Sequence, residues 1–404
     1  MNKTGVTKSI ASALLACCVG VQPAEAAPEK LKVFIVAGQS NTVGHANGHT
    51  MATLFNADGP KDEALANLVF GKDGKLSTQR YDETLALAKQ LNELTGGVGD
   101  PTIKAMTDAA EKAAAEAKAA PMKAALDAYK KDVVAASAVS DRVYINSIAD
   151  GNRRSGKLGV GFGGSEAKIG PEYAFGLSIA EKINGPILII KTSWGGKSLN
   201  YDFRPPSASP FELTGQEKGN PDDVKKNAGL FYRIMNEAVH GVLDNLKDHH
   251  KGYDPAAGYE IAGFVWFQGF NDQFDPAFKA NYRDNMVAFI KDIRSEYKAP
   301  KMPFVIGVLG TGQTKKNVDK NEVSVAQRAA AAMPEFKGNV VAVESYTEYA
   351  LDSLEVFNAG WQKNYYLWDL VGSDRPYHYL GSGKFFVRLG DAFATAMAGM
   401  MKNQ

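Results

Sequence analysis

The stretch Leu31-Lys-Val-Phe-Ile-Val-Ala-Gly-Gln-Ser-Asn41 joins a short apolar run to a glycine turn with a polar end. The run from Leu31 to Ala37 is rich in β-branched residues and almost continuously apolar, which is typical of a strand covered on both faces. The glycine at position 38 permits a sharp turn. We therefore predict a buried parallel strand that ends in Gly38-Gln39-Ser40-Asn41.

Similar apolar runs recur along the chain at 186–192, 261–267, 304–309 and 340–344. The helix-like stretches around them are 172–183, 229–246, 278–297, 323–333 and 384–397. Strands that alternate with helices indicate an α/β fold, a three-layer α/β/α sandwich of the flavodoxin-like kind around a parallel sheet. Ligands bind beyond the carboxyl ends of the strands in such a sheet, so the polar residues there are the site candidates.

The overall composition is that of an ordinary globular protein, with 404 residues, 45% of them hydrophobic and 23% charged. The formal net charge of +1 leaves no basic excess to hold a phosphate backbone. We therefore expect no nucleic-acid partner. The composition indicates no particular oligomeric state.

The first 26 residues predict an export signal. Lys3 and Lys8 give a positive start, residues 10–21 form an apolar run, and Ala24-Glu-Ala26 is a small-residue cleavage site. The run is too short to span a bilayer, and no other stretch is long and apolar enough. We expect a mature domain over 27–404 that is periplasmic or extracellular.

Both cysteines, Cys17 and Cys18, lie inside this signal. The mature chain is therefore expected to have neither disulfides nor thiolate chemistry. Leu14-Leu-Ala-Cys17 has some features of a lipoprotein processing site, but Leu15 fits it poorly, so soluble export is favoured over lipid anchoring.

The segment at about 51–150 interrupts the alternation of strands and helices. Residues 102–139 are rich in alanine and lysine, which are strong helix formers, and Pro121 divides them into two stretches. We predict an inserted helical hairpin on a single core domain.

Polar blocks follow three of the predicted strands. A serine at a tight strand-to-helix turn, such as Ser40, exposes its hydroxyl and leaves nearby N–H groups free for an oxyanion, although it can also serve only as a helix cap. Thr192-Ser-Trp-Gly-Gly-Lys-Ser198 brings paired glycines, and Trp266-Phe-Gln-Gly-Phe-Asn-Asp272 brings two amide donors.

A candidate base lies near the C-terminus, in Ser373-Asp-Arg-Pro-Tyr-His-Tyr379. Histidine is the base that a neutral serine needs, and a carboxylate orients it. The other five histidines are expected in solvated or capping roles: His45, His49, His240, His249 and His250. Serine, glycine N–H, amide and histidine together predict acyl transfer. No His/Asp cluster has metal-ligand spacing, so neither a metal nor a cofactor is predicted.

At these residues the chain resembles the SGNH/GDSL hydrolase superfamily, and within it the sialate O-acetylesterase-like carbohydrate esterases. The resemblance covers most of the chain outside 51–150. Its blocks are Phe34–Asn41, Ile169–Gly176, Ile190–Leu199 and Val265–Gly269. It implies a secreted serine esterase with the SGNH-type sandwich that removes acetyl groups from poly- or oligosaccharides.

The resemblance implies Ser40 as nucleophile and His378 as base. It places the oxyanion hole at the N–H groups of Ser40 and Gly196, with a side-chain amide from Asn271 or Gln268. The superfamily has Gly-x-Asn-Asp, which residues 269–272 match, whereas the branch commonly has Gln-Gly-Glu and Phe270 replaces that Glu. Both amides therefore stay open.

The acid of the triad departs from the family pattern Asp-x-x-His. Asp374 precedes His378 by four positions, and Arg375 stands in the expected place. Asp374 is the first candidate. Asp369, Glu344 or a Ser–His dyad without an acid are the alternatives.

Candidate substrate contacts are Gln39, Trp194, Arg204 and Tyr377. The aromatic-rich stretch 361–379 can stack on sugar rings, and Arg204 can meet an acidic or sulfated sugar, although most such aromatics belong to protein cores. Two rival functions remain at this point. One is a lipase or thioesterase of the same superfamily, and the other is a noncatalytic glycan-binding protein with this fold.

Overall fold

The computed structural model describes residues 1, 29–72, 76–215 and 219–402. The predicted export signal lies outside the described residues, except for Met1, and stays a prediction. No helix in the described part combines the length and the apolar character needed to cross a bilayer.

The core is a mixed α/β structure around a seven-stranded sheet, ordered β4-β3-β6-β1-β7-β8-β9. Every neighbouring pair is parallel except β3 and β4. The strands of this sheet are β1 Leu31–Gly38, β3 Val143–Ala149, β4 Asn152–Lys157, β6 Ile187–Ser193, β7 Tyr259–Phe267, β8 Phe304–Val308 and β9 Val340–Glu344. Two short strands, β2 Ala46–Asn47 and β5 Lys168–Ile169, form a separate pair.

Helices and 3-10 turns connect these strands. The α-helices are α1 Ser40–Val43, α2 Pro60–Phe70, α3 Thr78–Thr95, α4 Pro101–Lys104, α5 Ala109–Ala136, α6 Pro171–Lys182, α7 Pro221–Asn227, α8 Leu230–Leu243, α9 Leu246–His249, α10 Pro276–Glu296, α11 Lys315–Val318, α12 Glu322–Ala331, α13 Leu351–Asn358, α14 Tyr365–Val371 and α15 Gly383–Met401. The 3-10 turns are η1 Gly48–Phe55, η2 Asn271–Phe274, η3 Pro334–Phe336, η4 Ser345–Glu348 and η5 Pro376–Gly381.

All five strands predicted from apolar runs are confirmed within two residues of their predicted ends, and the five predicted helices also form. β1 lies in the middle of the sheet, between β6 and β7. The strands β3 and β4 were not predicted. β3 carries Asn146 and Ser147 among its apolar residues, and β4 is a polar edge strand, so neither has the continuous apolar pattern.

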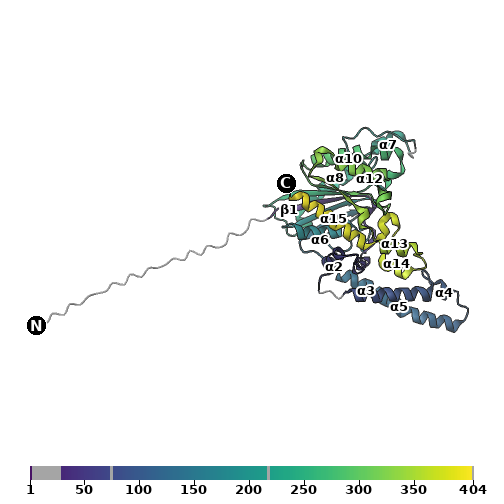
Figure 1. The fold of residues 1–404 in the computed structure, drawn as a ribbon. Coiled ribbons are helices and arrows are strands. Elements are labelled where there is room, and N and C mark those ends of the chain that lie inside the picture. Colours follow the sequence, from purple (N-terminus) through teal and green to yellow (C-terminus); the bar gives the residue numbers. More distant parts are fainter. Residues whose placement is uncertain (2–28, 73–75, 216–218, 403–404) are drawn as a thin grey trace.

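Helices cover both faces of the sheet, as Figure 1 shows. Alternate side chains of β1 point to opposite faces. Phe34 and Val36 join the core cluster that contains residues of α6 and α15, whereas Val33 and Ile35 join the cluster with α8, α10 and α12. Burial on both faces explains why β1 is almost wholly apolar.

The alanine-rich segment differs from its prediction. α5 runs unbroken through Pro121, so the predicted division at that proline was wrong. Pro121 is exposed, and the carbonyl that it leaves without a donor can bind water, while the flanking alanines favour helix. α5 packs against α3, and the pair projects from the rest of the molecule with α4 (Figure 1).

The interrupting segment is also shorter than the predicted 51–150. Its last part contains β3, which pairs with β6 inside the central sheet. Its first part contains α2, which packs on α6. The projecting helices are therefore confined to the span from α3 to α5.

A buried ion pair fixes the middle of the sheet to its surroundings. Lys191 of β6 is fully buried, and its Nζ donates to Glu172 Oε2 (2.8 Å), the Val43 carbonyl (2.9 Å) and the Phe162 carbonyl (2.8 Å). Glu172 Oε1 accepts from the N–H of Gly170 (2.8 Å). Burial lowers the pKa of Lys191 although Glu172 opposes the shift, so the charge is stable only with these partners in place.

We expect Lys191→Met to lower the free energy of unfolding by about 3–5 kcal/mol, because it leaves the Glu172 carboxylate buried and unpaired. Urea denaturation measures the change. The double variant Lys191→Met/Glu172→Gln should recover part of the loss, since no lone charge remains. Lys157→Met, which removes an exposed partner of Asp141, should leave the midpoint near that of the wild type. Equal effects of the two lysine substitutions would contradict this account.

Candidate active site

The turn after β1 presents Ser40 at the first position of α1. Gly38 is required there because a Cβ at this position would lie 2.2 Å from the carbonyl oxygen of Phe267. Ser40 is 8% exposed, and its N–H has no hydrogen-bond acceptor among the described residues. The serine thus combines a mostly buried side chain with an unpaired backbone donor at a helix start.

The turn η5 brings His378 next to this serine turn. Asn41 Nδ2 donates to the carbonyl of Tyr377 (3.2 Å), so the residue after Ser40 is joined to the residue before His378. α1 and η5 are in contact. The structure therefore brings the predicted nucleophile and base to the carboxyl end of β1.

Asp374 lies beside the imidazole of His378, with its Oδ2 3.2 Å from Nδ1. Burial raises the pKa of Asp374, but the His378 and His45 rings and the N–H of Arg375 outweigh it, so this pKa lies well below its usual range. The group is therefore a carboxylate at neutral pH, as the acid of a triad must be.

A strained turn lets a carboxylate four residues before the histidine reach it. Tyr379 (φ 49°) and Leu380 (φ 65°) both adopt the left-handed conformation, which costs about 1–3 kcal/mol for such residues. The Tyr379 hydroxyl accepts from the N–H of Gly310 (2.9 Å), and its ring stacks on Phe385 at 3.9 Å. The N–H of Asp374 donates to the Leu380 carbonyl (3.0 Å) and closes the turn.

The two alternative acids are engaged elsewhere. Asp369 Oδ2 accepts from Lys130 (2.7 Å). Both carboxylate oxygens of Glu344 accept from Arg328, at 2.6 and 2.9 Å. Asp374 is thus the candidate acid that the described part of the chain places against His378.

Two loops build the opposite side of the site. Gly196 follows β6 in the left-handed conformation (φ 68°), and its N–H has no acceptor within the described ranges. Asn271 Nδ2 donates one hydrogen to the Gly196 carbonyl (2.8 Å), so its second hydrogen is left for a ligand. These two donors and the N–H of Ser40 are the available oxyanion donors.

Gln268 has no such free donor. It is 3% exposed, and its Nε2 contacts Gln39 Oε1 (3.2 Å), the Lys197 carbonyl (2.9 Å) and Asp272 Oδ2 (2.5 Å). Its Oε1 accepts from Tyr282 (3.0 Å). Of the two amides that the sequence left open, the geometry leaves Asn271.

Gln39 also belongs to this buried framework and does not face a substrate. Its Oε1 accepts from the N–H groups of Gly269 (3.1 Å) and Asn271 (3.3 Å), and its Nε2 donates to Asn271 Oδ1 (3.1 Å). The amide of Gln39 thereby fixes the orientation of the Asn271 side chain.

The remaining candidate substrate contacts divide into buried and exposed residues. Trp194 is 9% exposed and packs against Phe203 and Phe231, so it is a core residue. The Arg204 guanidinium donates to the carbonyls of Asn200 (2.7 Å) and Ser209 (2.9 Å) and holds the loop between them. Tyr377 is 44% exposed beside His378 and remains accessible to a ligand.

Asp272 joins the two oxyanion loops, a role that the sequence did not reveal. It is fully buried and accepts from the N–H groups of Leu199 (2.9 Å) and Asn200 (2.9 Å) as well as from Gln268. Burial raises the pKa of Asp272 to about 7. No local pattern in Gly269–Asp272 indicates this role, and only the fold places Asp272 against the backbone that follows Gly196.

His45 corrects a second expectation, since it is neither solvated nor a cap. Its ring stacks on His378 at 4.0 Å with an interplanar angle of 3°, and its Nδ1 lies 3.3 Å from Asp374 Oδ2. The ligand atoms of His45, Asp374 and His378 lie within 4.8 Å of one another. The parallel ring planes hold the two nitrogen lone pairs in separate planes, however, whereas one metal ion requires them to converge.

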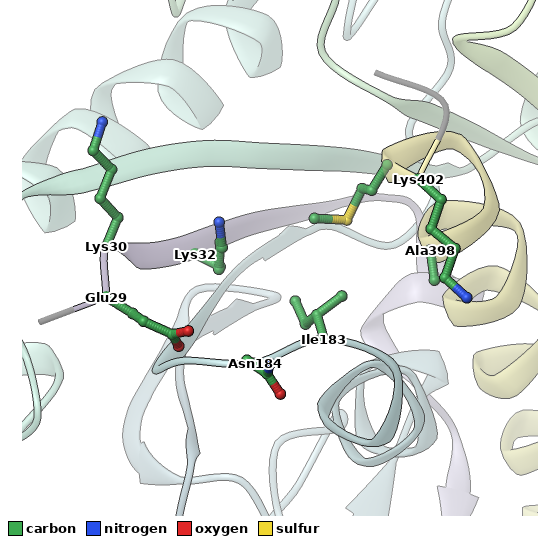
Figure 2. Close-up of a pocket in the computed structure, with 8 residues that line it drawn as sticks. Glu29, Lys30, Lys32, Ile183, Asn184, Ala398 and Lys402 are labelled. Atoms are coloured by element: carbon green, nitrogen blue, oxygen red, sulfur yellow. The ribbon is translucent and has the colours of Figure 1, made fainter. Parts of the chain in front are cut away.

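A pocket of about 380 Å³ opens at the other edge of the sheet, where β1 begins. Figure 2 shows Glu29, Lys30 and Lys32 around it, together with Asn184 and the end of α15. It lies at the amino ends of the strands, away from Ser40. The carboxyl edge is therefore the candidate reaction site.

We expect Asp272→Asn to lower kcat/KM by about 10–100-fold on p-nitrophenyl acetate, a small ester suited to this serine–histidine arrangement. An amide in this place turns an NH₂ group toward a backbone N–H and displaces the Gly196 loop. Steady-state kinetics measure the loss. Asp284→Asn, an exposed change beside Arg283, should leave the rate near wild type. A wild-type rate for Asp272→Asn would show that the loop does not depend on this carboxylate.

Comparison with known proteins supports the same chemistry. Residues 157–351 match the family described as carbohydrate esterase, sialic acid-specific acetylesterase. This range includes Gly196 and Asn271, whereas Ser40 and His378 lie outside it. No curated protein matches the chain significantly.

Solved structures with a similar course of the chain include a protein from Arabidopsis thaliana (16% identity, TM-score 0.38, 78% of this chain and 86% of that one). A carbohydrate acetylesterase from Xanthomonas citri matches at 12% identity and a TM-score of 0.37, over 78% of this chain and 49% of that one. NanS matches at 10% identity and a TM-score of 0.36, over 78% of each chain.

The matched range contains the sequence blocks around Gly196 and Gly269. The block around Ser40 precedes it in the chain. Over residues 157–351 the chain is therefore similar to the carbohydrate esterases described as sialic acid-specific acetylesterases.

Proposed function

We propose that this protein is an exported O-acetylesterase that hydrolyses acetyl esters on poly- or oligosaccharides through an acyl-enzyme on Ser40. The observation that carries the proposal is one cluster at the carboxyl end of β1. Ser40 starts α1 there, His378 is held beside it through the Asn41–Tyr377 hydrogen bond, and unpaired N–H groups lie on the other side.

In the first step, Ser40 Oγ attacks the acetyl carbonyl carbon while His378 Nε2 takes the hydroxyl proton. The Asp374 carboxylate beside Nδ1 stabilises the imidazolium that forms. The N–H groups of Ser40 and Gly196 and the Asn271 amide receive the oxyanion. Each donor of this kind contributes about 10²–10³ in rate.

The tetrahedral intermediate then expels the sugar oxygen, which takes the proton from His378, and the acetyl group stays on Ser40. Water then gives a proton to His378 and attacks the acetyl–Ser40 ester. Collapse of the second intermediate releases acetate and returns the proton to Ser40 Oγ. The side chains named here carry out each proton transfer, so the scheme includes no metal or cofactor.

The surroundings of Ser40 favour a small acyl group. Asn41, His378 and Asn271 are polar, and Gly196 has no side chain. A lipase or thioesterase needs an apolar wall for a long acyl chain. The polar lining therefore supports acetyl esters over fatty acyl esters.

A row of aromatic rings extends from the base and suits a sugar ligand. The ring centroid of Tyr377 lies 4.5 Å from that of His378 and 5.9 Å from that of Phe270. The ring centroids of Phe270 and Phe274 are 5.2 Å apart. Tyr377 is 44% and Phe274 69% exposed. Exposed rings of this kind offer flat apolar faces on which the C–H groups of a pyranose can pack.

The family also gives a proposal for the domain organisation. The mature chain over 27–404 forms one SGNH-type three-layer sandwich, and the projecting helices α3 to α5 are an insertion in it. The export signal at 1–26 delivers the enzyme to the periplasm or the outside, where acetylated polysaccharides are found. Binding through the aromatic row and catalysis at Ser40 then act on the same chain of sugars.

We expect Ser40→Ala to reduce acetate release from acetylated polysaccharides by at least about 10³-fold, because the covalent step loses its nucleophile. A panel of acetylated xylan, pectin and sialylated glycans, assayed for free acetate, measures this. Ser295→Ala, an exposed serine on α10, is the control and should retain full activity.

Three outcomes would contradict the proposal. Absence of acetate release by the wild type from every substrate, with retained glycan binding, would support a noncatalytic glycan-binding protein. Equal rates for Ser40→Ala and the wild type would remove Ser40 from the mechanism. Faster turnover of long-chain p-nitrophenyl esters than of the acetate would support the lipase alternative.

We expect Phe274→Ala to raise KM for an acetylated oligosaccharide by about 2- to 12-fold, as for the loss of one aromatic contact of about 0.5–1.5 kcal/mol. The kinetics on p-nitrophenyl acetate should not change, because that ester does not reach Phe274. Leu351→Ala, an exposed apolar residue on α13, is the matched control. Equal KM values for Phe274→Ala and the control would exclude the ring from binding.

A further inference from the structure

Hydrogen bonds of the Ser373 side chain hold together the two chain segments that carry His45 and His378. Ser373 Oγ donates to the His45 carbonyl and accepts from the N–H of Asn47, both at 3.0 Å. His45 lies in the loop that follows α1 and Asn47 in the short strand β2, while Ser373 precedes the turn that carries His378. These hydrogen bonds hold the two segments side by side, and the fold thereby stacks the His45 ring on the His378 ring.

The same carboxylate oxygen of Asp374, Oδ2, lies near the rings of both His45 and His378. Its Oδ1 accepts from the N–H of Arg375 (2.7 Å), and its Oδ2 lies 3.3 Å from His45 Nδ1 and 3.2 Å from His378 Nδ1. The His378 Nδ1 is buried, and its contact with Oδ2 lies outside the angles of a hydrogen bond. The carboxylate is therefore not committed to His378 alone.

We propose that His45 is a positioning residue that shares the Asp374 carboxylate with the base His378 and thereby keeps the base unprotonated at lower pH. The proposal rests on the function proposed above for Ser40 and His378. His45 itself does not touch the reacting atoms.

Two physical effects act in the same direction. A neutral His45 that donates its Nδ1–H to Oδ2 withdraws part of the negative charge that would otherwise stabilise the imidazolium of His378. A protonated His45 repels that imidazolium directly, since the ring centroids are 4.0 Å apart. Both effects favour neutral His378, the form that accepts a proton from Ser40.

The other charged groups around His45 do not reverse this preference for neutral His378. Burial lowers the pKa of His45; the Asp374 hydrogen bond opposes this, while the charges of His378 and of Lys168 on β5 lower it further. The Arg375 guanidinium carbon lies 4.6 Å from the centroid of the Trp361 ring, so this charge is engaged by Trp361. Among the described residues around the pair, Asp374 is thus the anion and Lys168 the additional cation.

The test uses His45→Phe, which keeps a flat ring in the stack and removes both the N–H and the charge. We expect the acid-limb midpoint of kcat/KM for p-nitrophenyl acetate to move to higher pH by about half a pH unit or more. His45→Asn retains an N–H donor without a titrating charge, so its midpoint should fall between those of the wild type and His45→Phe. His249→Phe, which removes a histidine bound to Asn146, should leave the midpoint in place.

A merely structural role would lower the rate at every pH without moving the midpoint, and that result would overturn the proposal. A shift toward lower pH would overturn it as well. Thermal unfolding of each variant checks that the fold is retained.

A second measurement does not depend on turnover. Proton NMR of the imidazole Cε1–H of His378, in a Ser40→Ala background with and without His45→Phe, follows the protonation of the ring directly. We expect the titration midpoint to rise in the double variant. An unchanged NMR midpoint refutes the role of His45, whereas absent ester cleavage by the wild type with a raised NMR midpoint refutes only the proposed function.

Discussion

The buried ammonium of Lys191 is the contact on which the arrangement of the site depends. It reaches from β6, the neighbour of the central strand β1, to the carbonyl of Val43, at the end of α1, and to Glu172 at the start of α6. A fully buried charge is tolerated only when every donor has a partner, so these segments have to meet at one point. Because Val43 ends the helix that Ser40 begins, the same contact fixes the nucleophile turn over the sheet.

The oxyanion side of the site depends on a second buried network, which consists of amides around one carboxyl group. Gln39 orients Asn271, Gln268 joins Gln39 to Asp272, and Asp272 holds the backbone after Gly196. Such groups are costly when unpaired, and the network leaves few alternative arrangements. The free N–H of Gly196 and the second hydrogen of the Asn271 side-chain amide are thus oriented before a substrate arrives. This is the condition for effective stabilisation of a developing charge.

The base side is held by strain and by stacking. Two consecutive non-glycine residues, Tyr379 and Leu380, adopt positive φ directly after His378, and the buried Tyr379 hydroxyl anchors them. This turn lengthens the family spacing between acid and base by one residue and still brings Asp374 to the ring. It also places His45 in the stack, so that one carboxylate serves two imidazoles.

The sequence by itself determined five of the parallel strands, five of the helices between them and the residues at the carboxyl ends of those strands, because apolar periodicity and glycine turns are local signals. It therefore placed Ser40 and Gly196 directly after β1 and β6, where the structure has them, while the roles of these residues and of His378 belong to the proposed function. Only the tertiary structure decided between Asn271 and Gln268, assigned Trp194 and Arg204 to the framework, and brought His45 and Asp272 into the site. Those roles depend on which hydrogen-bond partners remain free after packing, and contacts between residues hundreds of positions apart leave no local pattern. For the same reason Pro121 did not break α5, since its effect depends on exposure to water and not on its identity alone.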